Sequence, residues 1–415
     1  MAAVEEARKR PIWARPPVLR LLCVALFAEL GVAVLNVLAM PVYLRDERNL
    51  TEGIAGVVMM AFLLTEALFK SYFGHLADRF GRSRFLLFAP IVWMTTPLLT
   101  LAVPPSWGSG QIAAFVGLRV LDGVAAAMLW PAAYAAVAEA VEDGQKSKAL
   151  SMLNVCFMVG LALGVPAGGV INSLFDSLSA AFYLATILFA ATFVAAACCV
   201  RTDLRAKHSE ADAVSEHSIA DVVAAAKKLP LVLIVGFITF FGVGVPMVVI
   251  QFFAKDVFGL SQAQFGALVL PAAIAMAVLS VPLGSWGEKI GRGRAVKVGL
   301  LFCACGVWFI SLGNWFAPFE SLWAVAVGAI LVGLGFLLAI PAWYASVSLI
   351  DSRKSASNLG AVMTAQGFGA IVGLLVGAKA YEVNPYAPFI LCSGAVSIGW
   401  VLSLLEPTEA KSSRE

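Results

Sequence analysis

Five ionisable side chains interrupt apolar runs in the first half of the chain: Glu29, Glu66, Lys70, Arg119 and Asp122. A charge at the centre of a membrane helix costs roughly 2.5 to 3.5 kcal/mol on insertion scales, so each of these residues is a candidate for function. Glu66 and Lys70 are four residues apart and Arg119 and Asp122 are three apart, so each pair shares a helical face and can form an ion pair.

Three acids and two bases leave one carboxylate over, and Glu29 has no partner within its own apolar run. Burial disfavours the charged form of a carboxylate, so such a group can gain and lose a proton. We therefore expect Glu29, together with Asp122, to be the candidate for proton coupling. A structural role is the alternative, with a neighbouring helix supplying Lys70 or Arg119 to Glu29.

Polar and aromatic side chains line the same runs. Asn36 lies two helical turns from Glu29 on one face. The polar and aromatic residues concerned are Asn36, Arg119, Trp130, Tyr134, Gln251, Trp343 and Tyr344, and the family resemblance given below implies that they line a substrate cavity. Aromatic walls with few hydrogen-bonding groups suit an amphipathic organic molecule better than a sugar. Core packing or an interfacial belt would explain any single aromatic residue equally well.

The composition is that of a membrane protein. Of the 415 residues, 60% are hydrophobic and only 13% are charged, where a soluble domain has about 25% charged residues. The mean hydropathy of +0.89 excludes a water-soluble enzyme, because a soluble surface must be largely polar. About 20 helical residues cross the hydrocarbon core, so the chain is long enough for a bundle of twelve spans.

Apolar runs between charged or Pro/Gly-rich breaks predict these spans. They cover residues 18–43, 53–73, 85–104, 111–138, 149–172, 179–200, 230–254, 263–287, 296–316, 321–349, 357–380 and 386–405. We predict an all-α membrane protein with a six-helix bundle over 1–200, a cytoplasmic linker over 201–229 and a second six-helix bundle over 230–415. Ser218 and Asp221 in the linker resemble a capping box of a helix on the membrane surface, and a solvated linker is the alternative.

The charges outside the spans predict the orientation. Most Lys and Arg residues fall in the segments that share a side with the N-terminus, whereas the opposite loops hold only Arg45, Arg48, Lys255 and Lys379. The positive-inside rule then places both termini in the cytoplasm. We expect a monomer in a bacterial inner (plasma) membrane.

Other classes of function have little support in the sequence. A net charge of +3 without a basic stripe argues against nucleic acid as a partner. All seven cysteines fall in apolar runs, so we expect neither disulfides nor a metal site. The chain has no nucleophile elbow and no phosphate loop, so we expect no enzyme activity and no cofactor.

The two halves repeat a loop pattern. Glycine, acid, base, glycine and two arginines recur in register between residues 74–84 and 284–294, and Pro131 with Tyr134 recurs as Pro341 with Tyr344. Glycines at every fourth position follow in both halves, where they let helix backbones approach closely. These are Gly160, Gly164 and Gly168, and Gly369, Gly373 and Gly377.

Residues 74–84 resemble the signature loop between helices two and three of the major facilitator superfamily. Arg119, Asp122 and Gly123 resemble its fourth-helix motif, and residues 160–169 resemble the fifth-helix motif of its twelve-helix proton-coupled efflux transporters. The resemblance implies two pseudo-symmetric bundles, with spans one, four, seven and ten around a central cavity. It also implies that the signature loops gate the cytoplasmic side through Gly74, Asp78, Arg82, Glu139, Glu288 and Arg292.

The leading hypothesis is therefore a secondary transporter that exports small amphipathic organic compounds in exchange for protons by alternating access. One alternative is proton symport or uniport of a small organic anion, with Arg119 as the partner of the anion. An alternative of another class is a membrane sensor without transport.

Overall fold

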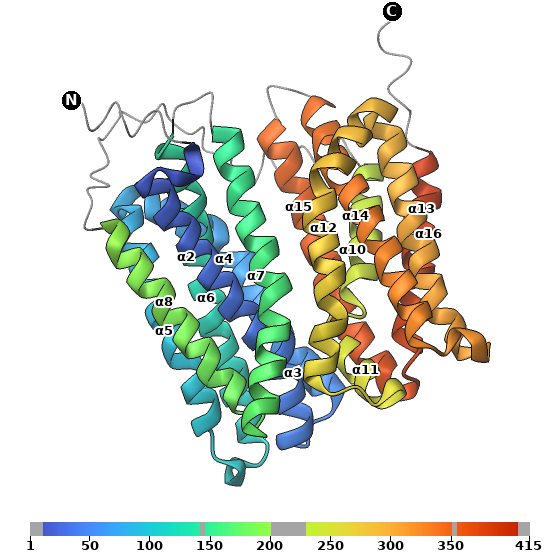
Figure 1. Cartoon of the computed structure of the whole chain (residues 1–415), viewed down its shortest axis with the longest axis horizontal. Coiled ribbons are helices and arrows are strands. Elements are labelled where there is room, and N and C mark those ends of the chain that lie inside the picture. Colours follow the sequence, from blue (N-terminus) through green and yellow to red (C-terminus); the bar gives the residue numbers. More distant parts are fainter. Residues whose placement is uncertain (1–10, 142–145, 201–229, 351–354, 406–415) are drawn as a thin grey trace, which may run out of the picture. The chain divides into compact units, whose positions relative to one another are not determined.

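The computed structural model describes residues 11–141, 146–200, 230–350 and 355–405 (Figure 1). Within these ranges every regular element is a helix, and ten helices are long and apolar enough to cross a membrane. Each of the twelve predicted spans overlaps a helix. The prediction of an all-α membrane protein is thus confirmed. The predicted surface helix near Ser218 lies outside the described residues.

The helices up to residue 200 correspond to the first six spans. They are η1 (Ile12–Ala14), α2 (Pro16–Val32), η2 (Ala33–Ala39), α3 (Met40–Val42), η3 (Tyr43–Glu47), α4 (Glu52–Phe80), α5 (Arg82–Ala102), η4 (Pro105–Trp107), α6 (Gly110–Glu139), α7 (Lys146–Phe175) and α8 (Ala180–Val200).

The helices from residue 230 onward correspond to the last six spans. They are α10 (Pro230–Gly244), α11 (Ile250–Phe258), α12 (Gln262–Ile290), α13 (Arg292–Ser311), η6 (Leu312–Asn314), η7 (Ala317–Phe319), α14 (Leu322–Ile350), α15 (Ser355–Val383) and α16 (Ala387–Leu404).

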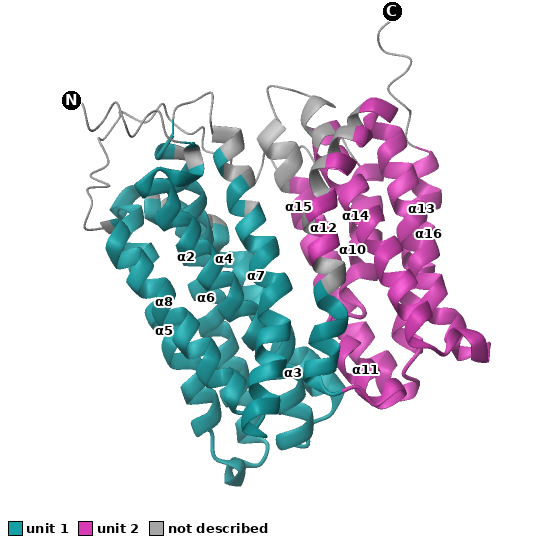
Figure 2. Cartoon of the chain, in the orientation of Figure 1, with its two compact units in different colours: residues 1–209, 261–273 teal, residues 210–260, 274–415 magenta. Residues whose placement is uncertain are grey.

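The chain divides into two compact units (Figure 2). Unit 1 comprises residues 1–209 and 261–273, and unit 2 comprises residues 210–260 and 274–415. The first turns of α12 thus belong to unit 1, where Asn172 Nδ2 donates a hydrogen bond of 2.6 Å to Gln262 Oε1. The predicted domain boundaries at residues 200 and 230 stay a prediction.

The same packing scheme occurs inside both units. In unit 1, α2 packs on α7 and α8, and α5 packs on α6 and α8. In unit 2, α10 packs on α15 and α16, and α13 packs on α14 and α16. These pairings correspond one to one when the first six spans are matched with the last six. The repeat in the sequence is therefore accompanied by a repeat of helix contacts.

Glycines set the closest helix approaches in both units. A Cβ added at Gly160 of α7 would lie 2.7 Å from the Cβ of Glu29, and one at Gly164 would lie 2.6 Å from the Cβ of Ala33. A Cβ added at Gly168 would likewise meet Leu38. In α15, Cβ atoms added at Gly369 and Gly373 would collide with backbone oxygens of α10, and one added at Gly377 would collide with the backbone oxygen of Val245, directly after α10. Only glycine permits these approaches, because any side chain would force the helices apart.

The seventh span, predicted over residues 230–254, is interrupted. Helix α10 ends at Gly244, and α11 starts only at Ile250. Pro246 lies in the interruption and has no N–H to donate to the preceding turn, so the helical hydrogen-bond ladder cannot continue through it. Gln251 consequently lies in the short α11.

The two signature loops share one backbone conformation. Gly81 joins α4 to α5 with φ +94°, and Gly291 joins α12 to α13 with φ +90°. Residues with a Cβ rarely adopt a positive φ of this size, so glycine is required for the turn itself. The repeated motif therefore fixes how each pair of helices is connected at the membrane surface.

Replacing Gly81 with Ala should destabilise the protein by roughly 1 to 3 kcal/mol, because alanine is strained at this positive φ. Thermal unfolding of the purified protein in detergent measures the effect. Gly117→Ala in α6 is the matched control, since a Cβ there would meet nothing within 4 Å. Equal unfolding temperatures for the two variants would contradict the strain argument.

Candidate functional site

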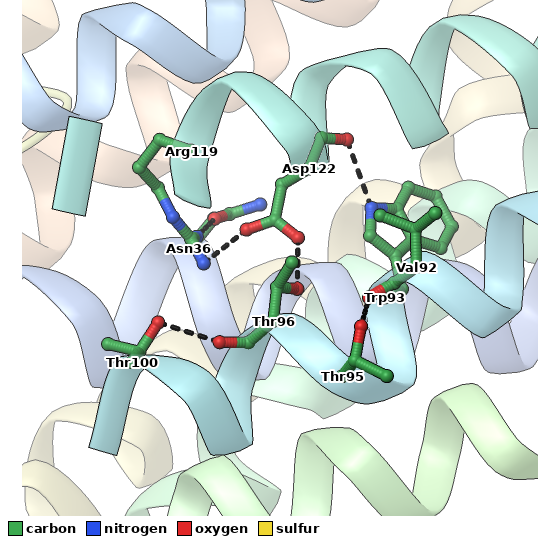
Figure 3. A network of polar contacts seen from close by, with 8 residues as sticks. All are labelled: Asn36, Val92, Trp93, Thr95, Thr96, Thr100, Arg119 and Asp122. Atoms are coloured by element: carbon green, nitrogen blue, oxygen red, sulfur yellow. Dashed lines mark hydrogen bonds and ion pairs between the residues drawn. The ribbon is translucent and has the colours of Figure 1, made fainter. Parts of the chain in front are cut away.

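A fully buried ion pair lies in α6. The guanidinium of Arg119 pairs with the carboxylate of Asp122 one helical turn away (Figure 3). Arg119 is 0% exposed and Asp122 is 1% exposed. Opposite charges in contact offset much of the cost of removing each from water, so the pair can lie at this depth.

Two residues of α5 fix the aspartate. The Thr96 hydroxyl donates a hydrogen bond to Asp122 Oδ1, and Trp93 Nε1 donates a bond of 3.1 Å to the main-chain oxygen of Asp122 (Figure 3). The Thr100 hydroxyl in turn donates to the carbonyl of Thr96 at 2.8 Å. The pattern of charged residues does not identify Thr96 or Trp93. The signal available in the sequence was the recurrence of side chains with a donor group at successive turns of the apolar run that forms α5.

Asn36 connects this pair to the first span. Arg119 Nη1 donates a hydrogen bond of 2.6 Å to Asn36 Oδ1 (Figure 3). Asn36 lies in η2, a π-helical segment over Ala33–Ala39. Such π-helical turns are rare and frequently mark functional sites. The structure thus joins two of the predicted cavity residues, Asn36 and Arg119, in one network across η2, α5 and α6.

Glu29 lies in α2, outside this network. Its side chain is 3% exposed, and its Oε2 atom has no hydrogen-bond partner among the described residues. Glu66 and Lys70 of α4 are charged neighbours of Glu29. Lys70 Nζ itself lies 2.9 Å from Glu66 Oε1, and the Lys70 side chain is half exposed.

The signature loop of the first half carries an ion pair between helices. Arg82 at the start of α5 pairs with Glu139 at the end of α6. Gly74 faces α6, where an added Cβ would lie 3.5 Å from the Cβ of Pro131. The side chains of Asp78 and Glu288 lie outside the part of the chain that the structure describes, and Arg292 begins α13.

The remaining predicted cavity residues fall in two groups. Trp130 and Tyr134 belong to unit 1, and their ring centroids lie 6.4 Å apart. Gln251, Trp343 and Tyr344 belong to unit 2, where Gln251 and Trp343 are buried. Tyr344 Oη donates a hydrogen bond of 2.8 Å to Gln366 Oε1, a residue that sequence reasoning missed. Within the described ranges no cluster of His, Cys, Asp or Glu side chains could hold a metal ion.

Replacing Asp122 with Leu should destabilise the protein by about 3 to 5 kcal/mol, because Arg119 would remain as a buried charge without its counter-ion. The double variant Arg119→Met with Asp122→Leu should recover most of that stability. Thermal unfolding in detergent compares the variants. A control is Glu66→Leu with Lys70→Met on the exposed side of α4. A double variant no more stable than Asp122→Leu alone would show that pairing is not what stabilises the network.

Comparison with known proteins identifies relatives along most of the chain. Multidrug resistance protein 2 of Bacillus subtilis is 23% identical over 361 residues, which cover 86% of this chain and 87% of that protein. The multi-drug resistance efflux pump PmrA of Streptococcus pneumoniae is 25% identical over 367 residues, with 85% and 86% covered.

The fold has counterparts among solved structures. The nucleoside transporter NupG superposes with a TM-score of 0.76 over 94% of this chain and 99% of NupG, at 12% identity. The profile of the Major Facilitator Superfamily matches residues 21–374 and 232–415, and these matches together span nearly the whole sequence. The chain is a member of the Major Facilitator Superfamily and an integral membrane transporter.

Proposed function

We propose that this chain exports small amphipathic organic compounds across a bacterial plasma membrane in exchange for protons, and that Glu29 carries the coupled proton. The two bacterial relatives, both named for multidrug resistance, support export of such compounds. The observation that carries the proton assignment is the buried Glu29 carboxylate with an unpartnered oxygen.

The distribution of intramembrane charge supports Glu29 as the coupling residue. Arg119 pairs with Asp122, and Lys70 pairs with Glu66, so each of these pairs is electrically neutral. Glu29 is the acid left over, and its protonation changes the charge of this part of unit 1 by one. A charge in hydrocarbon costs several kcal/mol, so binding or losing this proton alters which arrangement of the helices is favoured.

Glu29 also lies at a close contact between two helices of unit 1. Gly160 of α7 packs directly against its side chain, and the glycines that follow keep α7 close to the first span. A change in the charge or orientation of Glu29 therefore acts on a contact between two helices rather than on a loop. Alternating access in such transporters proceeds largely by movement of one helix bundle against the other around a fixed site.

Asp122 is the weaker of the two candidates for proton coupling. It is paired with Arg119 and accepts a hydrogen bond from Thr96, both of which favour its charged form. The same pairing speaks against an organic anion as the substrate, because Arg119 already binds Asp122 and Asn36. We propose in addition that the protein works as a monomer without enzyme activity, with both termini in the cytoplasm.

Replacing Glu29 with Gln should lower proton-driven efflux at least about tenfold, because an amide of similar size cannot take up the proton. Ethidium efflux from proteoliposomes with an imposed pH gradient measures coupled transport. Exchange of ethidium between equal concentrations on both sides, without a gradient, should persist in the same variant.

Glu66→Gln is the matched control, since it removes an intramembrane acid that is paired with Lys70. It should lose much less coupled efflux than Glu29→Gln does. Unchanged efflux in Glu29→Gln would rule out Glu29 as the coupling residue. Ethidium moving in the same direction as the protons would replace antiport by symport, and binding without movement would favour a sensor.

A further inference from the structure

In unit 2, Trp343 and Gln366 each bury an N–H donor that has no acceptor in the described part of the chain. Trp343 of α14 and Gln366 of α15 are each 2% exposed. Their Trp343 Nε1 and Gln366 Nε2 atoms have no hydrogen-bond partner in the described part of the chain. The great majority of buried polar groups in proteins are paired, so two unpaired donors in one unit need an explanation.

Both side chains pack against Gly236 of α10. A Cβ added there would lie 3.4 Å from Gln366 Cγ and 3.7 Å from Trp343 Cζ2, an atom two bonds from the indole nitrogen. Three helices of unit 2 therefore converge on the donor pair. The glycine keeps the α10 side of this point free of a side chain.

The orientation of the Gln366 amide is fixed from one side. Tyr344 Oη donates a hydrogen bond of 2.8 Å to Gln366 Oε1, which satisfies the amide oxygen and leaves the NH2 group directed elsewhere. The indole nitrogen of Trp343 can only donate. The site thus offers N–H groups from two residues and requires an oxygen or nitrogen acceptor.

The positions of the charged residues in unit 2 indicate whether the acceptor is an anion or a neutral group. In the sequence, the Lys, Arg, Asp and Glu residues of 230–405 lie at the ends of the predicted spans or in loops. An anion beside Trp343 would be buried without a counter-charge, which is costly. A neutral carbonyl oxygen has two lone pairs and can accept from both residues at once.

We propose that Trp343 and Gln366 form a subsite for the carbonyl oxygen of an uncharged, planar organic substrate. This inference rests on the export function proposed above and names a substrate class for it. Trp343 and Tyr344 supply flat aromatic surface beside the donors, and Tyr344 acts as a positioning residue through its bond to Gln366.

Binding of xanthone and xanthene tests the proposal, because these three-ring compounds differ only in one carbonyl group. Equilibrium dialysis against the full chain in lipid nanodiscs, with empty nanodiscs to correct for partition into lipid, gives both dissociation constants. The wild-type protein should prefer xanthone about tenfold, as expected for two net hydrogen bonds. Trp343→Phe and Gln366→Met should each reduce this preference by about threefold or more.

Trp308→Phe is the matched control, because Trp308 Nε1 already donates to Ser397 Oγ at 3.1 Å. It should keep the wild-type preference for xanthone. A preference for xanthone that is unchanged in both Trp343→Phe and Gln366→Met would overturn the proposal.

Equal affinities for xanthone and xanthene in the wild-type protein would also overturn the subsite, whatever the variants do. If ethidium efflux remained proton-driven in that case, the export function would stand without this substrate class. If instead the preference for xanthone were present and neither ethidium nor xanthone were exported, the subsite would stand and the export function would fail.

Discussion

A charge in hydrocarbon must be paired or neutralised, and the described part of unit 1 is built around this constraint. Arg119 and Asp122 are both fully buried, and each would be costly alone. Their pairing within one turn of α6 makes the helix electrically neutral at that depth. The hydrogen bonds from Thr96 and to Asn36 then bring the neighbouring helices to the pair. Charge neutralisation and helix packing are thus the same set of contacts.

Close contacts between helix backbones are the second feature that holds the helices in place. Where α7 meets the first span and α15 meets α10, glycine replaces the side chains that would otherwise separate the helices. Lipid tails are as apolar as leucine, so packing rather than hydrophobic burial must hold membrane helices together. Gly160 combines both constraints, because the close approach that it allows is to Glu29. The carboxylate is thereby enclosed by protein.

The sequence predicted the helical class and the repeat, and it suggested the pairing between Glu66 and Lys70. All three follow from the spacing of residues along the chain. The sequence did not predict Thr96 and Gln366 as partners, since a hydrogen bond between helices depends on the rotation of each helix about its axis. The π-helical turn around Asn36 was missed for the same reason. The break after Gly244 was missed although Pro246 was visible, because proline is often tolerated inside membrane helices.

The two units share one packing scheme but carry different polar groups. Unit 1 places ionisable groups on α2, α4 and α6, whereas unit 2 places the uncharged donors Trp343 and Gln366 on α14 and α15. A proton site needs a carboxylate that changes its charge, and a subsite for a neutral substrate is best kept free of such a charge. Duplication of the six-helix unit allows both conditions to be met in one chain, since each copy carries its own polar groups. If both proposals hold, the asymmetry of charge between two halves with the same packing keeps the proton site and the carbonyl subsite in different units.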